Sequence, residues 1–75
     1  MQPVDVERIA RSIVREYGLP FRLEAISLER PDRCVVVFAD PYRQPSTIAV
    51  AIRCDDKVSA YGVRQAFERE LRVHH

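Results

Sequence analysis

The two cysteines, Cys34 and Cys54, are the strongest nucleophiles in a chain with little other chemistry. Two thiols are too few for a disulfide scaffold, and they lack the CxxC spacing of a zinc site. Two interpretations stay open. They are two reduced, buried side chains that act as small hydrophobic residues, or they form a cross-strand disulfide.

The remaining polar side chains do not form a catalytic arrangement in the sequence. His74 and His75 end the chain outside every predicted element, so no Ser-His or Cys-His pair is expected and we assign them no role. Asp55 and Asp56 adjoin on a connector, where carboxylates do not converge on one substrate. Only two glycines are present, which excludes a glycine-rich phosphate loop. We therefore expect no enzyme, no cofactor, no metal and no small-molecule substrate.

Length and composition favour one small globular domain over residues 1–75. A hydrophobic fraction of 47% with 31% charged residues argues against disorder. The net charge of +1 gives no bulk attraction to nucleic acid or to anionic lipid. Apolar runs are too short for a membrane span and no signal peptide is visible, so we expect a cytoplasmic protein without membrane contact.

A β-hairpin at residues 34–54 is the predicted centre of the domain. Two β-branched runs, 34–39 and 47–54, flank a loop that contains two prolines. Pairing the runs symmetrically places Cys34 opposite Cys54, Val36 opposite Ile52 and Phe38 opposite Val50.

Side chains alternate across a strand, so the hairpin has two faces. The predicted core face is bulky and apolar: Cys34, Val36, Phe38, Ile48, Val50, Ile52 and Cys54. The opposite face is also apolar, but small, with arginines at its edges: Arg33, Val35, Val37, Ala39, Thr47, Ala49, Ala51 and Arg53. An antiparallel sheet with a solvated face usually has polar residues there.

Two amphipathic helices are predicted, one before the strands in the sequence, over 4–17, and one after them, over 59–72. Asp5 and Ser59 are the expected N-caps, with Val4 and Val58 packed against each first turn. Gly18 is expected to end the first helix. The expected inward faces are Val6, Ile9, Ala10, Ile13, Val14 and Tyr17 in the first helix, and Val63, Ala66, Phe67, Glu70 and Leu71 in the second. Gly62 in the second helix suggests close approach to the sheet or to the other helix.

A first strand is predicted over 21–30, with a bulge near Glu24–Ala25 because the apolar parity changes there. Ile26 opposite Phe38 and Leu28 opposite Val36 would join the core, while Ala25, Ser27 and Glu29 join the small-residue face. The expected fold is α+β: a two-layer αβββα domain whose three-stranded antiparallel meander carries both helices on one face.

The order αβββα and three segments resemble the double-stranded RNA-binding domain family. Gly18-Leu19-Pro20 stands at the break after the family's first helix, and Arg30-Pro31-Asp32-Arg33 at its first hairpin turn. Ser59 matches the start of the family's second helix. The family's two phosphate-binding lysines are replaced by Ala60 and Tyr61, and Arg64 alone falls at a basic position. The resemblance implies the fold and, through arginines, an RNA-binding function.

Our first functional hypothesis is a protein-interaction module, as a homodimer or with another protein. Its expected site is the small-residue face: Ala25, Val35, Val37, Ala39, Ala49 and Ala51, with Arg33 and Arg53 as rim. Such a patch is on the order of several hundred Å², the scale of partner surfaces.

The alternative is binding of nucleic acid, duplex RNA above all. Its expected residues are arginines of the first helix, the first turn and the second helix, with the tip of the central loop: Arg8, Arg11, Arg15, Arg30, Arg33, Tyr42, Arg43 and Arg64. The first-helix arginines equally suit a solvated face with a Glu7–Arg11 pair.

Overall fold

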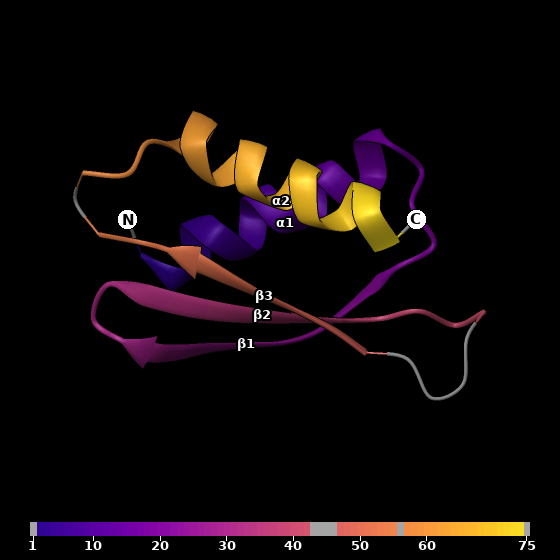
Figure 1. Ribbon diagram of the computed structural model, residues 1–75, viewed down its shortest axis with the longest axis horizontal. Coiled ribbons are helices and arrows are strands. Elements are labelled where there is room, and N and C mark those ends of the chain that lie inside the picture. The colour runs from indigo at the N-terminus through magenta and orange to yellow at the C-terminus, as the bar shows by residue number, and fades with distance from the viewer. Residues whose placement is uncertain (1, 43–46, 56, 75) are drawn as a thin grey trace.

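The computed structural model describes residues 2–42, 47–55 and 57–74. It consists of α1 (Pro3–Glu16), β1 (Arg22–Arg30), β2 (Arg33–Ala39), β3 (Thr47–Arg53) and α2 (Ala60–His74). Both helices lie on one face of an antiparallel sheet of order β1-β2-β3, and the other face is open (Figure 1). The predicted α+β class and αβββα order are confirmed.

The first helix begins earlier than the sequence predicts. Gln2 is the N-cap, and the Asp5 carboxylate accepts a hydrogen bond from the Gln2 backbone N–H at 3.1 Å. Asp5 therefore occupies the third helical position, where it still satisfies a free donor, and is not the N-cap as predicted. Val4 lies inside the helix and is exposed, so its predicted packing is wrong.

The first helix ends as predicted, at Gly18. The backbone N–H of Gly18 donates to Arg15 and that of Leu19 to Val14, while Gly18 has a φ of +60°. This pair of bonds is a Schellman motif, which needs a left-handed residue that glycine adopts without a Cβ clash.

A tight turn sets the register of β1 against β2. Pro31 and Asp32 form the turn, so Arg30 pairs with Arg33, and the register shift between Leu28 and Arg30 then pairs Ile26 with Val36. The predicted partners of Ile26 and Leu28 are two residues out, because the turn is one residue shorter than the expected Pro31-Asp32-Arg33 and the register shifts by one after Leu28. Register shifts occur between Leu23 and Ala25, as predicted, and between Leu28 and Arg30.

The register of β2 against β3 is also two residues from the prediction. Phe38 pairs with Ile48, Val36 with Val50 and Cys34 with Ile52. The ladder stops at Ala39–Thr47 because Asp40 turns the chain, its carboxylate accepting the Tyr42 backbone N–H at 2.9 Å. A shift of two residues preserves parity, so the predicted faces of β2 and β3 are correct.

The second helix is capped by Ser59, as predicted: its hydroxyl accepts the Gly62 N–H at 3.1 Å. A Cβ at Gly62 would meet only Ser59 Oγ at 3.6 Å and Val58 Cγ1 at 3.8 Å, so Gly62 does not serve close approach to another element. Glu70 is exposed and belongs to the outer face, contrary to the prediction.

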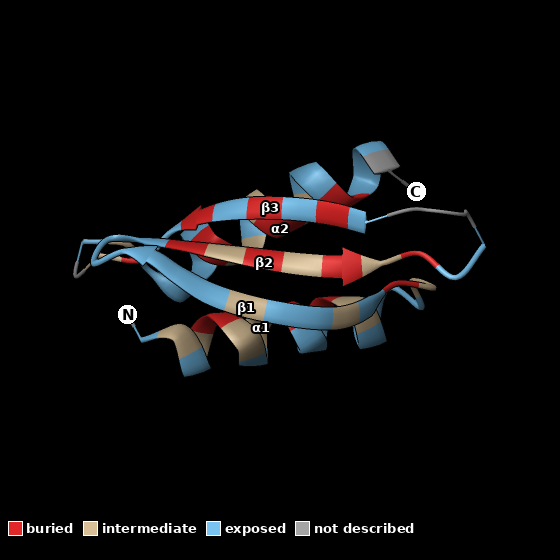
Figure 2. Ribbon diagram, turned by 90° about the horizontal axis from the view of Figure 1, so that it is seen from below, coloured by how far each residue is buried: buried red, intermediate tan, exposed pale blue. Residues whose placement is uncertain are grey.

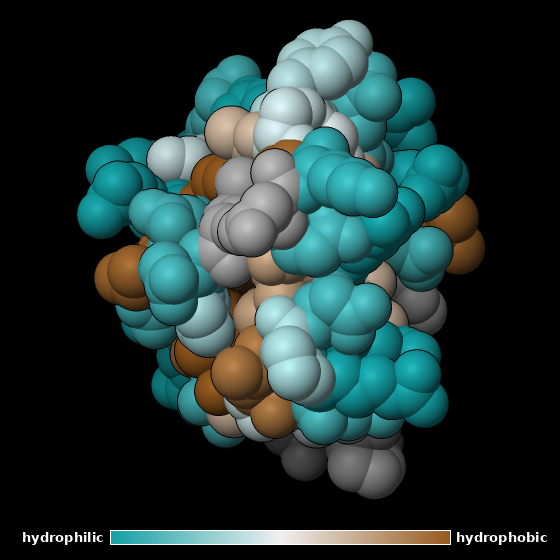
Figure 3. Space-filling model, turned by 90° about the vertical axis from the view of Figure 1, so that its left-hand side faces the viewer, coloured by the Kyte–Doolittle hydropathy of each residue, from teal (hydrophilic) through white to brown (hydrophobic). Residues whose placement is uncertain are grey.

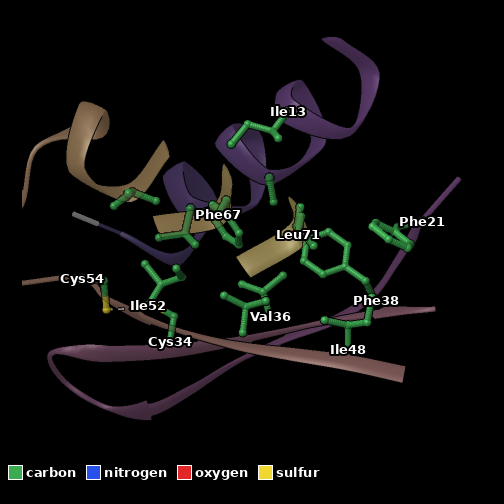
Figure 4. Close-up of a cluster of buried hydrophobic side chains, with 14 residues drawn as sticks. Ile13, Phe21, Cys34, Val36, Phe38, Ile48, Ile52, Cys54, Phe67 and Leu71 are labelled. Carbon is green, nitrogen blue, oxygen red and sulfur yellow. Dashed lines mark hydrogen bonds between the residues drawn. The ribbon is translucent and has the colours of Figure 1, made fainter. Parts of the chain in front are cut away.

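The core lies between the helices and the sheet (Figure 4). Phe38 of β2 meets Phe67 of α2 edge to face, with ring centroids 6.1 Å apart, a favoured aromatic geometry. Two predicted core residues lie outside it. Leu28, on the edge strand β1, is 54% exposed. Tyr17 follows the end of α1 and turns outward, donating its hydroxyl hydrogen to Glu68 at 2.8 Å.

Candidate interaction face

The open face of the sheet is built from rows of paired residues that cross all three strands. Figure 2 shows this face, with buried and exposed residues alternating along β3. The two middle rows carry no charge: Ala25, Val37 and Ala49 form one, and Ser27, Val35 and Ala51 the other. The structure therefore brings together the predicted partner-binding residues of all three strands.

One end of the open face is a row of three arginines, formed by Arg30, Arg33 and Arg53. Arg33 lies 3.6 Å from Glu29, and the Arg53 Nε donates to Asp55 at 2.6 Å. Within the described part of the chain, Arg30 has no ion-pair partner. The sequence prediction included Arg33 and Arg53 in this face but assigned Arg30 only to RNA binding.

The other end of the open face is formed by the row of Arg22, Ala39 and Thr47. Arg22 donates from Nη2 to Glu24 Oε1 at 3.1 Å, which holds this carboxylate at the same end. Glu24 is the extra residue of the bulge between Leu23 and Ala25. The face thus has an arginine row at one end and the Arg22–Glu24 ion pair at the other.

The candidate RNA-binding residues are dispersed. The β1–β2 turn and the starts of both helices do lie at one end of the molecule (Figure 1), and Figure 3 shows mainly hydrophilic residues there. Arg8 and Arg64 line a hollow between the helices, whereas Arg11 and Arg15 line another beside β1. Tyr42, 82% exposed, follows the Ala39 end of β2, opposite to the Arg33 end, and Arg43 is outside the described residues.

Several of these arginines are already paired with carboxylates. Arg64 contacts Glu16 of α1 at 2.6 Å and Glu68 at 3.2 Å, and it is largely shielded from solvent. The hydrogen bond to Glu16 raises the pKa of Arg64 above its ordinary value. Arg11 lies 3.6 Å from Glu7, the pair that the sequence predicts. Arg64 therefore joins the two helices, which the sequence did not suggest.

Two titratable groups near the arginine row have shifted pKa values. Desolvation, followed by a contact with Cys54, raises the pKa of the Cys34 thiol to about 11. Desolvation would also raise the pKa of Asp55, but the hydrogen bonds from Arg53 and from the Lys57 backbone outweigh it and keep this pKa below 3.8. Asp55 is thus ionised at neutral pH and fixes the Arg53 side chain.

The described residues hold no group of three or more metal-ligating side chains. No helix among them is long and apolar enough to cross a membrane. Comparisons with protein-family models, with curated proteins and with solved structures find no match. The fold and the composition of the open face are therefore the basis for a functional proposal.

The arginine row could have been found from the sequence. A turn of two residues between strands pairs the residues on either side of it, here Arg30 and Arg33. Placing Arg53 in this row required the register of β3 against β2. The sequence of the loop over 40–46 does not specify that register. The contact of Arg64 with Glu16 depends on how the two helices pack, and no local pattern specifies it.

Proposed function

We propose that the chain is a non-catalytic interaction module that binds a second copy of itself through the open sheet face. The observation that carries the proposal is the pair of uncharged middle rows, which line the solvent-facing side of the sheet with alanine, valine and one serine. Small side chains let two sheets approach closely, and contiguous apolar surface of this kind is typical of partner sites.

Charge complementarity supports a second copy as the partner and specifies its orientation. Two sheets packed face to face can be related by a twofold axis parallel to the strands or perpendicular to them. The parallel axis places the arginine row of one copy against that of the other, which is repulsive. The perpendicular axis places β1 on the partner's β1 in the reverse direction, so that Arg30 meets the end that carries the Arg22–Glu24 ion pair, where Glu24 offers a carboxylate.

The size of the face makes this dimer a weak one. Strands of seven residues at ~3.3 Å rise, spaced ~4.8 Å apart, give three strands a footprint of about 330 Å². A standard interface buries about 800 Å² on each partner. We therefore expect a reversible dimer that forms in the upper micromolar range and leaves the fold of each copy unchanged.

Exchanging the charges of Arg30 and Glu24 tests the proposal. Sedimentation equilibrium of the wild type up to about 1 mM is expected to show a reversible dimer of twice 8.7 kDa. Arg30→Glu and Glu24→Arg should each weaken association, and the double variant should recover it because the attraction is restored with opposite sign.

Matched charge reversals on the exposed side of α2, Arg69→Glu and Glu70→Arg, are the controls and should leave association unchanged. A wild type that stays monomeric throughout would overturn the proposal. If the sheet variants and the controls change the strength of association equally, the proposed orientation of the two copies is wrong.

Duplex RNA is the second candidate. The αβββα topology and the shared hollow of Arg8, Tyr61 and Arg64 favour it. The ion pairs of Arg11, Arg33 and Arg64 and the near-zero net charge oppose it, since phosphate contacts would have to compete with those carboxylates.

A further inference from the structure

Cys34 and Cys54 form a close pair of buried thiols. Their Sγ atoms are 3.1 Å apart, and the Cys34 thiol donates a hydrogen bond to the Cys54 sulfur (Figure 4). Cys34 is 0% and Cys54 2% exposed, and both thiols are free. Among the described residues, the two cysteines belong to no group of three or more metal-ligating side chains.

The backbone holds the two thiols side by side. Cys34 pairs with Ile52, so Cys54 lies diagonally across the ladder and not directly opposite as predicted. The Cys54 backbone N–H donates to Asp32 at 2.9 Å, which fixes the end of β3 against the β1–β2 turn. A disulfide has an S–S distance of about 2.05 Å, so the two sulfurs need to approach by only about 1 Å.

We propose that Cys34 and Cys54 are a modification site that a low-molecular-weight disulfide converts reversibly into an intramolecular disulfide. This site is independent of the proposed interaction face, since both side chains are on the helix side of the sheet.

The first step is at Cys54, because it follows the last residue of β3 and is 2% exposed, whereas Cys34 is in the central strand and is completely buried. The Cys54 thiolate attacks one sulfur of the small disulfide, forms a mixed disulfide and releases one thiolate, which takes up a proton. The Cys34 thiol then loses its proton and attacks the Cys54 sulfur, which expels the second small thiol. The two protein thiols are oxidised by two electrons, and the small disulfide is reduced to two thiols.

Burial controls the rate of this exchange. Desolvation raises the pKa of Cys34 to about 11, so little thiolate is present at neutral pH in the closed structure. Cys54 itself is only 2% exposed, so its attack on the small disulfide requires local opening of the end of β3 and should be slow relative to a free thiol.

Oxidised glutathione is the probe that tests the site. In native buffer it should convert the wild type to a monomer lighter by two hydrogen atoms, and dithiothreitol should restore the original mass. The new bond joins residues 20 apart in sequence and restricts the unfolded chain. The melting temperature of the oxidised form should rise by roughly 10–20 °C.

Alanine variants separate the two steps. Cys34→Ala should accumulate a stable glutathione adduct at Cys54, and Cys54→Ala should remain unmodified under the same conditions. Native wild type that keeps both thiols while the denatured chain oxidises would overturn the proposal. Faster modification of Cys54→Ala than of Cys34→Ala would overturn the order of the steps.

Discussion

Val36 and Val37 are adjacent in β2, yet Val36 is completely buried in the core while Val37 pairs with Ala49 on the open face. The alternation of side chains along a strand separates their roles. Val36 packs beneath the helices and supports the fold, whereas Val37 is available to a partner.

Glutamate at these two positions should therefore have different effects. Val36→Glu places an unpaired carboxylate in the core and should cost about 3 kcal/mol or more, enough to unfold most of the chain. Val37→Glu should retain the helical circular dichroism signal but lose self-association in sedimentation. Equal unfolding by both substitutions would contradict the assignment of faces.

The two glycines should respond in opposite ways to alanine. Gly62→Ala should stabilise the domain by roughly 0.5–1 kcal/mol, because the site is helical and its nearest neighbours are at ordinary contact distances. Gly18→Ala should destabilise it by about 1 kcal/mol, since the φ of +60° is costly for a residue with a Cβ. Urea denaturation of both variants measures the difference, and a stabilising Gly18→Ala would contradict the Schellman cap.

The Cys34 thiol should make stability fall at alkaline pH. Its folded pKa, raised to about 11, lies above the ordinary thiol value of 9.0, so the folded state retains a proton that the unfolded chain loses. The contribution is complete below pH 9 and is lost as the pH rises toward 11. Denaturation of the reduced wild type and of Cys34→Ala across this range should show a steeper decline for the wild type. Parallel declines would show that the thiol is ionised equally in both states.

Arg64 should act as a structural link between the helices and not as an RNA contact. Arg64→Ala removes the ion pairs to Glu16 and Glu68, so the melting temperature should fall, by less at high salt. We expect no binding of duplex RNA at physiological salt, because carboxylates already occupy this arginine and others. Micromolar, salt-sensitive binding that Arg64→Ala weakens would instead favour the RNA-binding function.

The sequence predicted element order, parity and layer arrangement because each depends on short-range patterns. The alternation of Val36 and Val37 and the glycine at the end of α1 are examples. It failed where a distance along the chain had to be counted through a turn or a loop: the partner of Phe38 was placed two residues away. The same error hid the diagonal relation of Cys34 to Cys54. The open face was predictable despite this, since an even shift of register leaves each residue on its face.

Self-association through the open face is the central claim, and isotope-filtered nuclear Overhauser spectroscopy of a mixture of labelled and unlabelled chains tests it most directly. Only contacts between copies give signals in this measurement. Methyl groups of Ala25, Val37 and Ala49 should give such signals to Ser27, Val35 and Ala51 of the partner copy, because β1 lies against β1 in the reverse direction. Intermolecular signals confined to the helices or to the outer edge of β3, or none at concentrations where the dimer forms, would contradict the claim.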